Sequence, residues 1–249
     1  MSARSSKLQV WRVARSIYRD RTTYSNRTSR SRSLDSIDQN STTVDRRTTM
    51  KHSLEFFFDC SSPWTYLAFE NIQRELSGCD CKIDWKPILV GGVFNSVNPS
   101  VYASRENPVP SKAAYLRKDL NDWAAYSEVE IGWPDVFPVN SVKAMRGACW
   151  AIEKDILIDY VRSVFSKYWG ELKDISNNDV LRELTESMGL DSEEFFEAIS
   201  TQKYKDELRA NTEELIERGG FGSPTIFING NDMYFGNDRI ALIRRKISS

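Results

Sequence analysis

Residues 53–70, SLEFFFDCSSPWTYLAFE, describe the passage from a buried strand into a helix. The aromatic run that ends at Cys60 suits a buried β-strand. Ser62 and Pro63 then have the chemistry of a helix start, with a serine N-cap and a proline at the first helical position. After Pro63, apolar side chains recur at helical spacing: Trp64, Tyr66, Leu67, Phe69, Ile72 and Leu76. The stretch therefore predicts a strand, a tight turn and a helix.

The residues after this helix predict a second strand and then a long loop. Gly78 is expected to end the helix, and residues 82–88, KIDWKPI, complete a βαβ unit. Residues 91–110 carry a Gly-Gly pair and two Asn-Pro pairs, which together predict a loop. A loop of this length favours a functional role.

Helical patterning dominates the middle of the chain, and a β pattern returns near its end. The predicted helices cover residues 111–126, 141–154, 157–167, 178–188, 192–200 and 204–218. Predicted strands at 225–228 and 233–235 flank Asn229-Gly230-Asn231, which is a hairpin signature. A final helix is predicted from Asn237 to Ile247, with Asn237 and Asp238 as its caps.

A βαβ unit at the front and a ββα unit at the back enclose these helices. This is the order of an α/β, thioredoxin-like domain with a large α-helical insertion. The sequence thus predicts that residues 50–90 and 219–249 form the thioredoxin-like domain. Residues 91–218 are predicted to form a loop and an α-helical insertion domain.

The net charge of −1 combines two unlike parts of the chain. Residues 1–49 hold ten Arg and one Lys against four Asp, which leaves 23 basic and 31 acidic residues in the other 200. The acidic main part offers no basic field for nucleic acid, and no apolar run reaches the roughly 18 residues of a membrane span. The sequence therefore predicts neither a nucleic-acid-binding nor an integral membrane protein.

The first 49 residues contain 17 Ser or Thr and few apolar side chains, which predicts a disordered basic tail. Residues 8–19 nevertheless have one apolar helical face with arginines opposite, the profile of an organellar transit peptide. On that interpretation the protein is mitochondrial. The alternative, which we prefer, is that Met50 is the true start and the protein is cytoplasmic.

The four cysteines, at positions 60, 79, 81 and 149, form no CxxC pair, and His52 is the single histidine. A reducing compartment is the simplest interpretation. The spacing of the cysteines and the lone histidine predict no metal site. Cys60 is expected to be a buried core residue.

In a thioredoxin-like domain the reactive group lies where the first strand meets the first helix, because free N–H groups and the helix dipole stabilise an anion there. Ser62 and Thr65 occupy the positions at which a redox member has its two cysteines. Disulfide exchange therefore lacks its nucleophile and its resolving thiol. The Ser62 hydroxyl can instead donate a hydrogen bond to a sulfur anion that a ligand brings in. The alternative is that Ser62 is only an N-cap.

Two later stretches are candidates for completing this site. Ser223-Pro224 precedes a strand, which suggests a cis peptide bond facing the helix start, with the Ser223 backbone available to a peptide-like ligand. The alternative is a trans proline at the first residue of the strand. Asn237-Asp238 begins the last helix, whose N–H groups can receive a carboxylate while Asp238 pairs with an ammonium group. Here the alternative is that both residues are plain caps.

Five stretches together resemble a known family. They are FFFDCSSPWTYLAFE (56–70), PILVGGVFN (87–95), FPVNSVKAMRG (137–147), YWGELKDIS (168–176) and GGFGSPTIFINGNDMYFGNDR (219–239). In this order they resemble the 2-hydroxychromene-2-carboxylate isomerases, relatives of the kappa-class glutathione transferases in the DsbA-like branch of the thioredoxin superfamily. The resemblance covers residues 53–247 and none of the tail.

The resemblance implies glutathione as the cofactor. Ser62 would contact its sulfur as the catalytic residue, and Ser223 with Pro224 would hold its cysteinyl backbone. Asn237 and Asp238 would hold its γ-glutamyl end. An asparagine after the second strand also contacts glutathione in the family, and Asn98 is the match, with Asn95 close enough to compete.

The resemblance also implies the reaction. A glutathione thiolate would add reversibly to 2-hydroxychromene-2-carboxylate; ring opening, bond rotation and elimination would then give trans-o-hydroxybenzylidenepyruvate, an intermediate of aromatic degradation. Trp64, Phe94 and Trp123 are candidates for an apolar substrate wall, with ordinary core packing as the alternative for each. Two other functions stay open: a kappa-like transferase that conjugates electrophiles, and a non-catalytic module that binds glutathione or peptides. The family further suggests a homodimer.

Overall fold

The computed structural model describes residues 51–248. Three predictions therefore lie outside the described residues: the disordered basic tail at 1–49, the transit-peptide helix at 8–19, and the start at Met50. Within the described part, no helix is both long enough and apolar enough to cross a bilayer.

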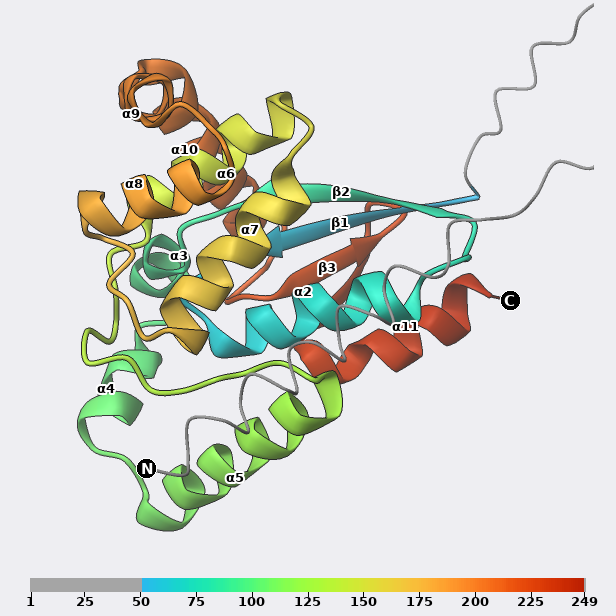
Figure 1. Ribbon diagram of the computed structural model, residues 1–249. Helices are drawn as coiled ribbons and strands as arrows, with labels where there is room; N and C mark the ends of the chain where they lie inside the picture. Colours follow the sequence, from blue (N-terminus) through green and yellow to red (C-terminus); the bar gives the residue numbers. More distant parts are fainter. Residues whose placement is uncertain (1–50, 249) are drawn as a thin grey trace, which may run out of the picture. The chain divides into compact units, whose positions relative to one another are not determined.

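The core of the fold is a four-stranded mixed sheet with the strand order β2-β1-β3-β4 (Figure 1). β1 (His52–Phe58) runs parallel to β2 (Cys81–Pro87) and antiparallel to β3 (Thr225–Ile228). β3 pairs in turn with the antiparallel β4 (Asp232–Phe235). The front and back of the chain thus meet in one sheet, which confirms the predicted thioredoxin-like order.

Successive side chains of β1 point to opposite faces of the sheet, as a strand requires. Leu54, Phe56 and Phe58 belong to the main core, beneath α2 (Pro63–Glu75) and α11 (Ile240–Ile247). Phe57 lies on the other face with Val93 of α3 (Val90–Val97) and Leu215 of α10 (Gln202–Glu217). Both faces are covered, so β1 reads as a continuous aromatic run rather than an alternating one.

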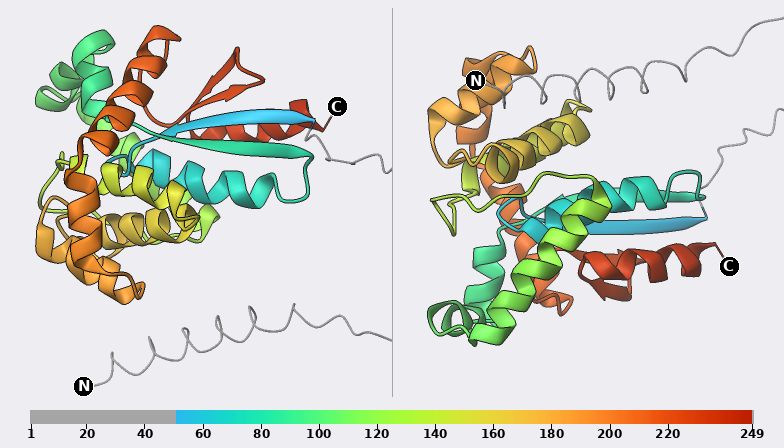
Figure 2. Two further views of the ribbon diagram at one scale, coloured as in Figure 1. Left: turned by 90° about the horizontal axis from the view of Figure 1, so that it is seen from above. Right: turned by 60° about the horizontal axis from the view of Figure 1, so that its bottom comes forward.

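Six further α-helices complete the described part, and all but α4 follow the predicted pattern closely. They are α4 (Ser100–Glu106), α5 (Pro110–Ser127), α6 (Val142–Glu153), α7 (Leu157–Phe165), α8 (Asn178–Ser187) and α9 (Ser192–Ser200). α6 to α10 gather at one end of the sheet, while α5 runs along α2 (Figure 2). The stacked rings of Tyr66 and Phe165, 4.7 Å between centroids, join α2 to α7.

The prediction of a long loop at 91–110 is wrong, because α3 and α4 occupy most of this stretch. The Gly-Gly pair suggested a loop, but both glycines lie in α3, and Gly92 serves helix packing. A Cβ on Gly92 would meet Thr212 Cγ2 of α10 at 3.3 Å, so the glycine lets α3 approach α10 closely. Burial of Val93 on the same side stabilises the helix against the low propensity of two glycines.

The last predicted helix also needs a correction at its start. Residues Asn237–Arg239 form a 3₁₀ turn, η2, and α11 follows it. Neither Asn237 nor Asp238 makes a side-chain cap bond, so their prediction as caps is wrong. The hairpin prediction is confirmed, since Asn229 and Gly230 both have positive φ, 50° and 87°.

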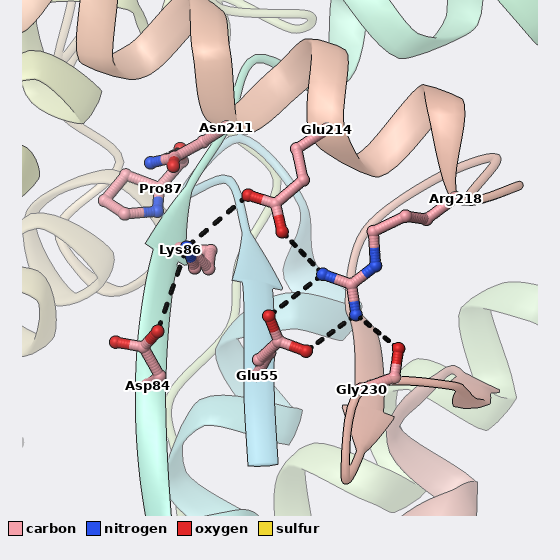
Figure 3. Close-up of polar contacts among 8 residues, drawn as sticks. All are labelled: Glu55, Asp84, Lys86, Pro87, Asn211, Glu214, Arg218 and Gly230. Atoms are coloured by element: carbon pink, nitrogen blue, oxygen red, sulfur yellow. Dashed lines mark hydrogen bonds and ion pairs between the residues drawn. The ribbon is translucent and has the colours of Figure 1, made fainter. Parts of the chain in front are cut away.

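Arg218, directly after α10, ties this helix to the sheet (Figure 3). Its guanidinium donates to both carboxylate oxygens of Glu55 on β1, at 2.9 and 2.6 Å, and to Glu214 at 2.6 Å. A further bond reaches the Gly230 carbonyl in the hairpin. The guanidinium carbon lies 3.9 Å from the Phe227 ring centroid, so the cation also covers the apolar surface of β3.

Candidate active site

The junction of β1 and α2 places Ser62 at the open start of a helix. Ser62 has extended backbone angles, its Oγ accepts the Thr65 N–H at 3.3 Å, and Pro63 takes the first helical position. The predicted N-cap is therefore confirmed. The N–H groups of Thr65 and Tyr66 donate to Ser62 and Pro63 has none, so within residues 51–248 the Trp64 N–H is the first-turn donor without an acceptor. It lies with the positive end of the α2 dipole at the start of the helix.

The Ser223–Pro224 peptide bond is cis, as predicted, and lies against this helix start. Ser62 Oγ donates to the Ser223 carbonyl at 3.4 Å. The Ser223 hydroxyl accepts the Asp59 N–H at 3.0 Å and bonds Thr65 Oγ1 at 2.8 Å. Two stretches about 160 residues apart in sequence are thus brought together. Sequence reasoning missed that the Ser223 side chain bridges them.

Asp59 is a second residue that sequence reasoning missed. Its side chain is 1 % exposed and lies at the edge of the site. Oδ1 accepts the Ser61 N–H at 2.9 Å, and Oδ2 accepts the Val90 N–H at 2.8 Å and the Ser141 hydroxyl at 3.1 Å. Burial raises the pKa of this carboxyl, while hydrogen bonds from Ser61, Val90 and Ser141 oppose the rise. One carboxyl group therefore holds the starts of α2, α3 and α6 together.

Cys60 is fully buried, which confirms its prediction as a core residue. Burial raises its pKa well above the ordinary value for a thiol. Its backbone is engaged on both sides, since its N–H reaches the Met145 sulfur at 3.3 Å and its carbonyl accepts the Trp169 indole N–H at 2.9 Å. Such a thiol has little thiolate character. Cys60 is therefore a poor candidate for a reactive thiol.

A cavity of about 1090 Å³ opens beside Ser62. Of the predicted residues, Ser62, Trp64, Phe94, Asn98 and Ser223 line it. Further lining side chains that sequence reasoning missed come from the insertion and are mainly apolar or cationic: Tyr102, Arg105, Leu116, Arg117, Trp133 and Phe137. No cysteine of residues 51–248 lines the cavity.

Asn98 and Asn95, the two candidates for the asparagine that contacts glutathione, occupy different surroundings in the structure. Asn98 lines the cavity and donates to the Phe221 carbonyl at 3.1 Å, next to the cis-proline segment. Asn95 lies outside the lining and accepts the Tyr102 hydroxyl at 2.8 Å. The position of Asn98 therefore favours it over Asn95. Its contact with glutathione stays a prediction.

Four other predicted residues lie outside the cavity lining. Trp123 packs on the α5 side, edge to face with Tyr126. Asn237 is buried and accepts Asn71 Nδ2 at 2.7 Å, while Asp238 is half-exposed and pairs with Arg239 at 3.0 Å. Pro224 is buried behind Ser223. Their roles toward substrate and glutathione stay predictions.

Comparison with known proteins agrees with this geometry. Residues 53–248 match the model of the DSBA-like thioredoxin domain, and the chain belongs to that family. It is 27% identical over 191 residues to a 2-hydroxychromene-2-carboxylate isomerase of Sphingobium xenophagum, covering 77% of this chain and 95% of that protein. It is 29% identical over 194 residues to the protein of that name from Pseudomonas putida, covering 76% and 91%.

Human glutathione S-transferase kappa 1 is also similar, 25% identical over 209 residues, covering 78% of this chain and 90% of the transferase. Among solved structures, a 2-hydroxychromene-2-carboxylate isomerase superposes with a TM-score of 0.66 at 25% identity, covering 79% of this chain and 94% of that one. The similar proteins thus include both 2-hydroxychromene-2-carboxylate isomerases and a kappa-class glutathione transferase.

Proposed function

We propose that this protein is a glutathione-dependent isomerase that converts 2-hydroxychromene-2-carboxylate to trans-o-hydroxybenzylidenepyruvate. One observation carries the proposal. A serine hydroxyl, in place of a thiol, stands at the open start of α2 opposite a cis-proline segment and beside a large, mainly apolar cavity. This arrangement suits an enzyme that uses the thiolate of a bound cofactor rather than one that exchanges disulfides through its own cysteines.

The residues present fit glutathione. The Ser223 N–H has no acceptor within residues 51–248, so it is available to a peptide-like ligand. The Ser62 bond to the Ser223 carbonyl is long at 3.4 Å, so the hydroxyl can exchange it for a sulfur anion. When bound, glutathione supplies the thiolate that adds to and later leaves the substrate.

The chain itself contributes position and charge stabilisation. Ser62 donates a hydrogen bond toward the sulfur, and the Trp64 N–H and the positive end of the α2 dipole stabilise negative charge there. Trp64 and Phe94 provide apolar surface beside Ser62, which excludes water from a flat substrate. Asp59 positions the junction and does not need to touch the substrate.

The test is a Ser62→Ala variant assayed for spectral conversion of the chromene carboxylate with catalytic glutathione. We expect the fold to persist with a loss of about 1 kcal/mol from the helix cap. We expect kcat/KM to fall about a hundredfold, as for the loss of one preorganised donor. Ser96→Ala, an exposed serine of α3 outside the cavity, is the matched control. An unchanged rate in Ser62→Ala would refute the role given to Ser62.

The second candidate is a kappa-like glutathione transferase, which the similarity to the human kappa protein supports. Thiol titration during turnover separates the two, because the isomerase leaves total free thiol constant and the transferase consumes it. Binding of glutathione with neither activity would favour a non-catalytic glutathione-binding or peptide-binding module. A homodimer and a cytoplasmic location are further parts of the proposal, which sedimentation and cell fractionation test.

A further inference from the structure

Two arginines in the cavity have no anionic partner. Arg105 of α4 and Arg117 of α5 both line it, and within residues 51–248 neither makes an ion pair or a hydrogen bond. The neighbouring Lys118 shows the usual arrangement, since it pairs with Asp122 one turn later on the same helix. The positions three and four residues from Arg117 on α5 are uncharged: Ala113, Ala114, Leu120 and Asn121.

The two guanidinium groups rest on aromatic rings of the cavity wall. The Arg105 guanidinium carbon lies 5.5 Å from the Phe94 ring centroid and 5.3 Å from that of Phe137. The Arg117 carbon lies 5.7 Å from the Trp133 ring centroid. Such stacking fixes the plane of a guanidinium while leaving its N–H edge available for bidentate pairing with a carboxylate.

The rings themselves form a connected wall. Trp133 and Phe137 meet edge to face at 5.8 Å, and Phe137 contacts Trp169 at 6.0 Å. Trp169 is held by its bond to the Cys60 carbonyl, so this wall is fixed to the junction that carries Ser62. The cavity therefore combines flat apolar surface, two cations and a thiol-binding helix start.

The charge of the lining favours an anion. Among residues 51–248 the one carboxyl group of the lining is that of Asp59, which is buried and already accepts three hydrogen bonds. Both oxygens of Asp59 accept these hydrogen bonds, and within residues 51–248 Asp59 makes no ion pair with either arginine. A cavity with two unpaired guanidinium groups attracts a negatively charged ligand.

We propose that Arg105 and Arg117 form a carboxylate-recognition subsite, and that Phe94, Phe137 and Trp133 hold the attached planar ring. The subsite selects flat aromatic carboxylates over neutral compounds of the same shape. This inference rests on the proposed function in taking the cavity beside Ser62 as the substrate site, and it names the residues that recognise the substrate's carboxylate.

The test is calorimetric titration of the full chain with two unreactive probes, 2-naphthoate and 2-naphthamide. We expect the wild type to bind the carboxylate more tightly than the amide. Arg117→Gln and Arg105→Gln should each weaken 2-naphthoate binding about tenfold, the effect of losing one charge-assisted pair, and leave 2-naphthamide unchanged. Arg117→Lys should retain part of the preference. Lys112→Gln, an exposed cation of α5 outside the cavity, should change neither affinity.

Equal wild-type affinities for the two probes, or no binding of either, would overturn the inference. So would equal weakening of both probes by Arg117→Gln, because that result means a structural role. The isomerase assay separates this inference from the proposed function. Turnover with an unchanged KM in both arginine variants would leave the function standing without the subsite. Tighter binding of 2-naphthoate than of 2-naphthamide, without turnover of the chromene carboxylate, would support the subsite and contradict the isomerase function.

Discussion

At Asp59, burial and hydrogen bonding have opposite effects on the pKa of one carboxyl group. Its carboxyl group is withdrawn from water, yet it joins the starts of three helices through donors at Ser61, Val90 and Ser141. Desolvation raises the pKa above the ordinary 3.8, and the donors lower it by less. The folded protein therefore binds this proton more tightly than the unfolded chain does.

This shift predicts a pH dependence that an Asp59→Asn variant removes. The free energy of unfolding of the wild type relative to the variant should be greatest below pH 3.8 and should fall as the pH rises through the raised pKa. Urea titrations across the acidic and neutral range measure it. Asp135→Asn, at an exposed carboxylate outside the cavity, controls for the loss of one negative charge. A difference that rises with pH would contradict the direction of the shift.

At the scale of elements, the C-terminal end of α10 attaches this helix to the sheet. Leu215 packs on Phe57, and Arg218 pairs with Glu55 while lying on Phe227. Lys86 of β2 extends the network to Glu214 at 3.4 Å. Because α10 also packs against α3, its placement sets the position of the segment that leads to Asn98.

Replacing Arg218 by methionine tests this attachment. The substitution keeps apolar cover on Phe227 but leaves Glu55 and Glu214 facing each other without the cation. These side chains are about one-fifth to one-third exposed, so we expect a loss of about 1–3 kcal/mol, between the values for exposed and buried pairs. Chemical denaturation measures it. Arg209→Met, on the exposed side of the same helix, should cost under about 1 kcal/mol. Equal losses in the two variants would contradict a special role for Arg218.

The elements that sequence predicted well are those with local signals. Ser62-Pro63 marks the start of α2, and the helix predicted at 192–200 is present as α9, whose cap Asp191 accepts the N–H groups of Glu193 and Glu194. α3 was missed because the reason for its Gly92, close approach to α10, is a contact with a distant segment. Local chemistry therefore predicts helix starts better than it predicts why a glycine is present.

At the scale of the whole described part, one hydrophobic core joins the sheet to the helical insertion. The same cluster contains Leu54 and Phe56 of β1 and Leu184 of α8. Tyr66 stacks on Phe165 across the boundary between the two predicted domains. A core shared in this way favours cooperative unfolding of both parts.

This core predicts that Leu184→Ala in the insertion and Leu54→Ala in the sheet lower the same thermal transition. Each should cost about 2–5 kcal/mol, as for a buried leucine in a well-packed core. Far-ultraviolet circular dichroism and tryptophan fluorescence should give coincident midpoints in both variants. Separate transitions, with the insertion melting first in Leu184→Ala, would instead support the two domains that the sequence division predicts.

The site as a whole was only half visible in the sequence. Ser62 and Ser223, which line the cavity, were predicted because a helix start and a strand entry carry local chemical signals, whereas Pro224, predicted from the same signal, lies outside the lining. Arg105, Arg117, Trp133 and Phe137 were missed because they come from insertion segments that meet only in the folded molecule. Asp59 stands next to the recognised stretch, but its donors lie 31 and 82 residues away at Val90 and Ser141.

The serine at the start of α2 determines how the site responds to oxidants and alkylating reagents. With serine and threonine where two thiols would stand, and with Cys60 buried, residues 51–248 place no sulfur in this cavity that an oxidant or an alkylating reagent could consume. Under the proposed function, throughput follows the concentration of a diffusible thiol rather than the oxidation state of the protein. The rate of such a catalyst falls when the concentration of the diffusible thiol falls, and it recovers when the thiol is restored.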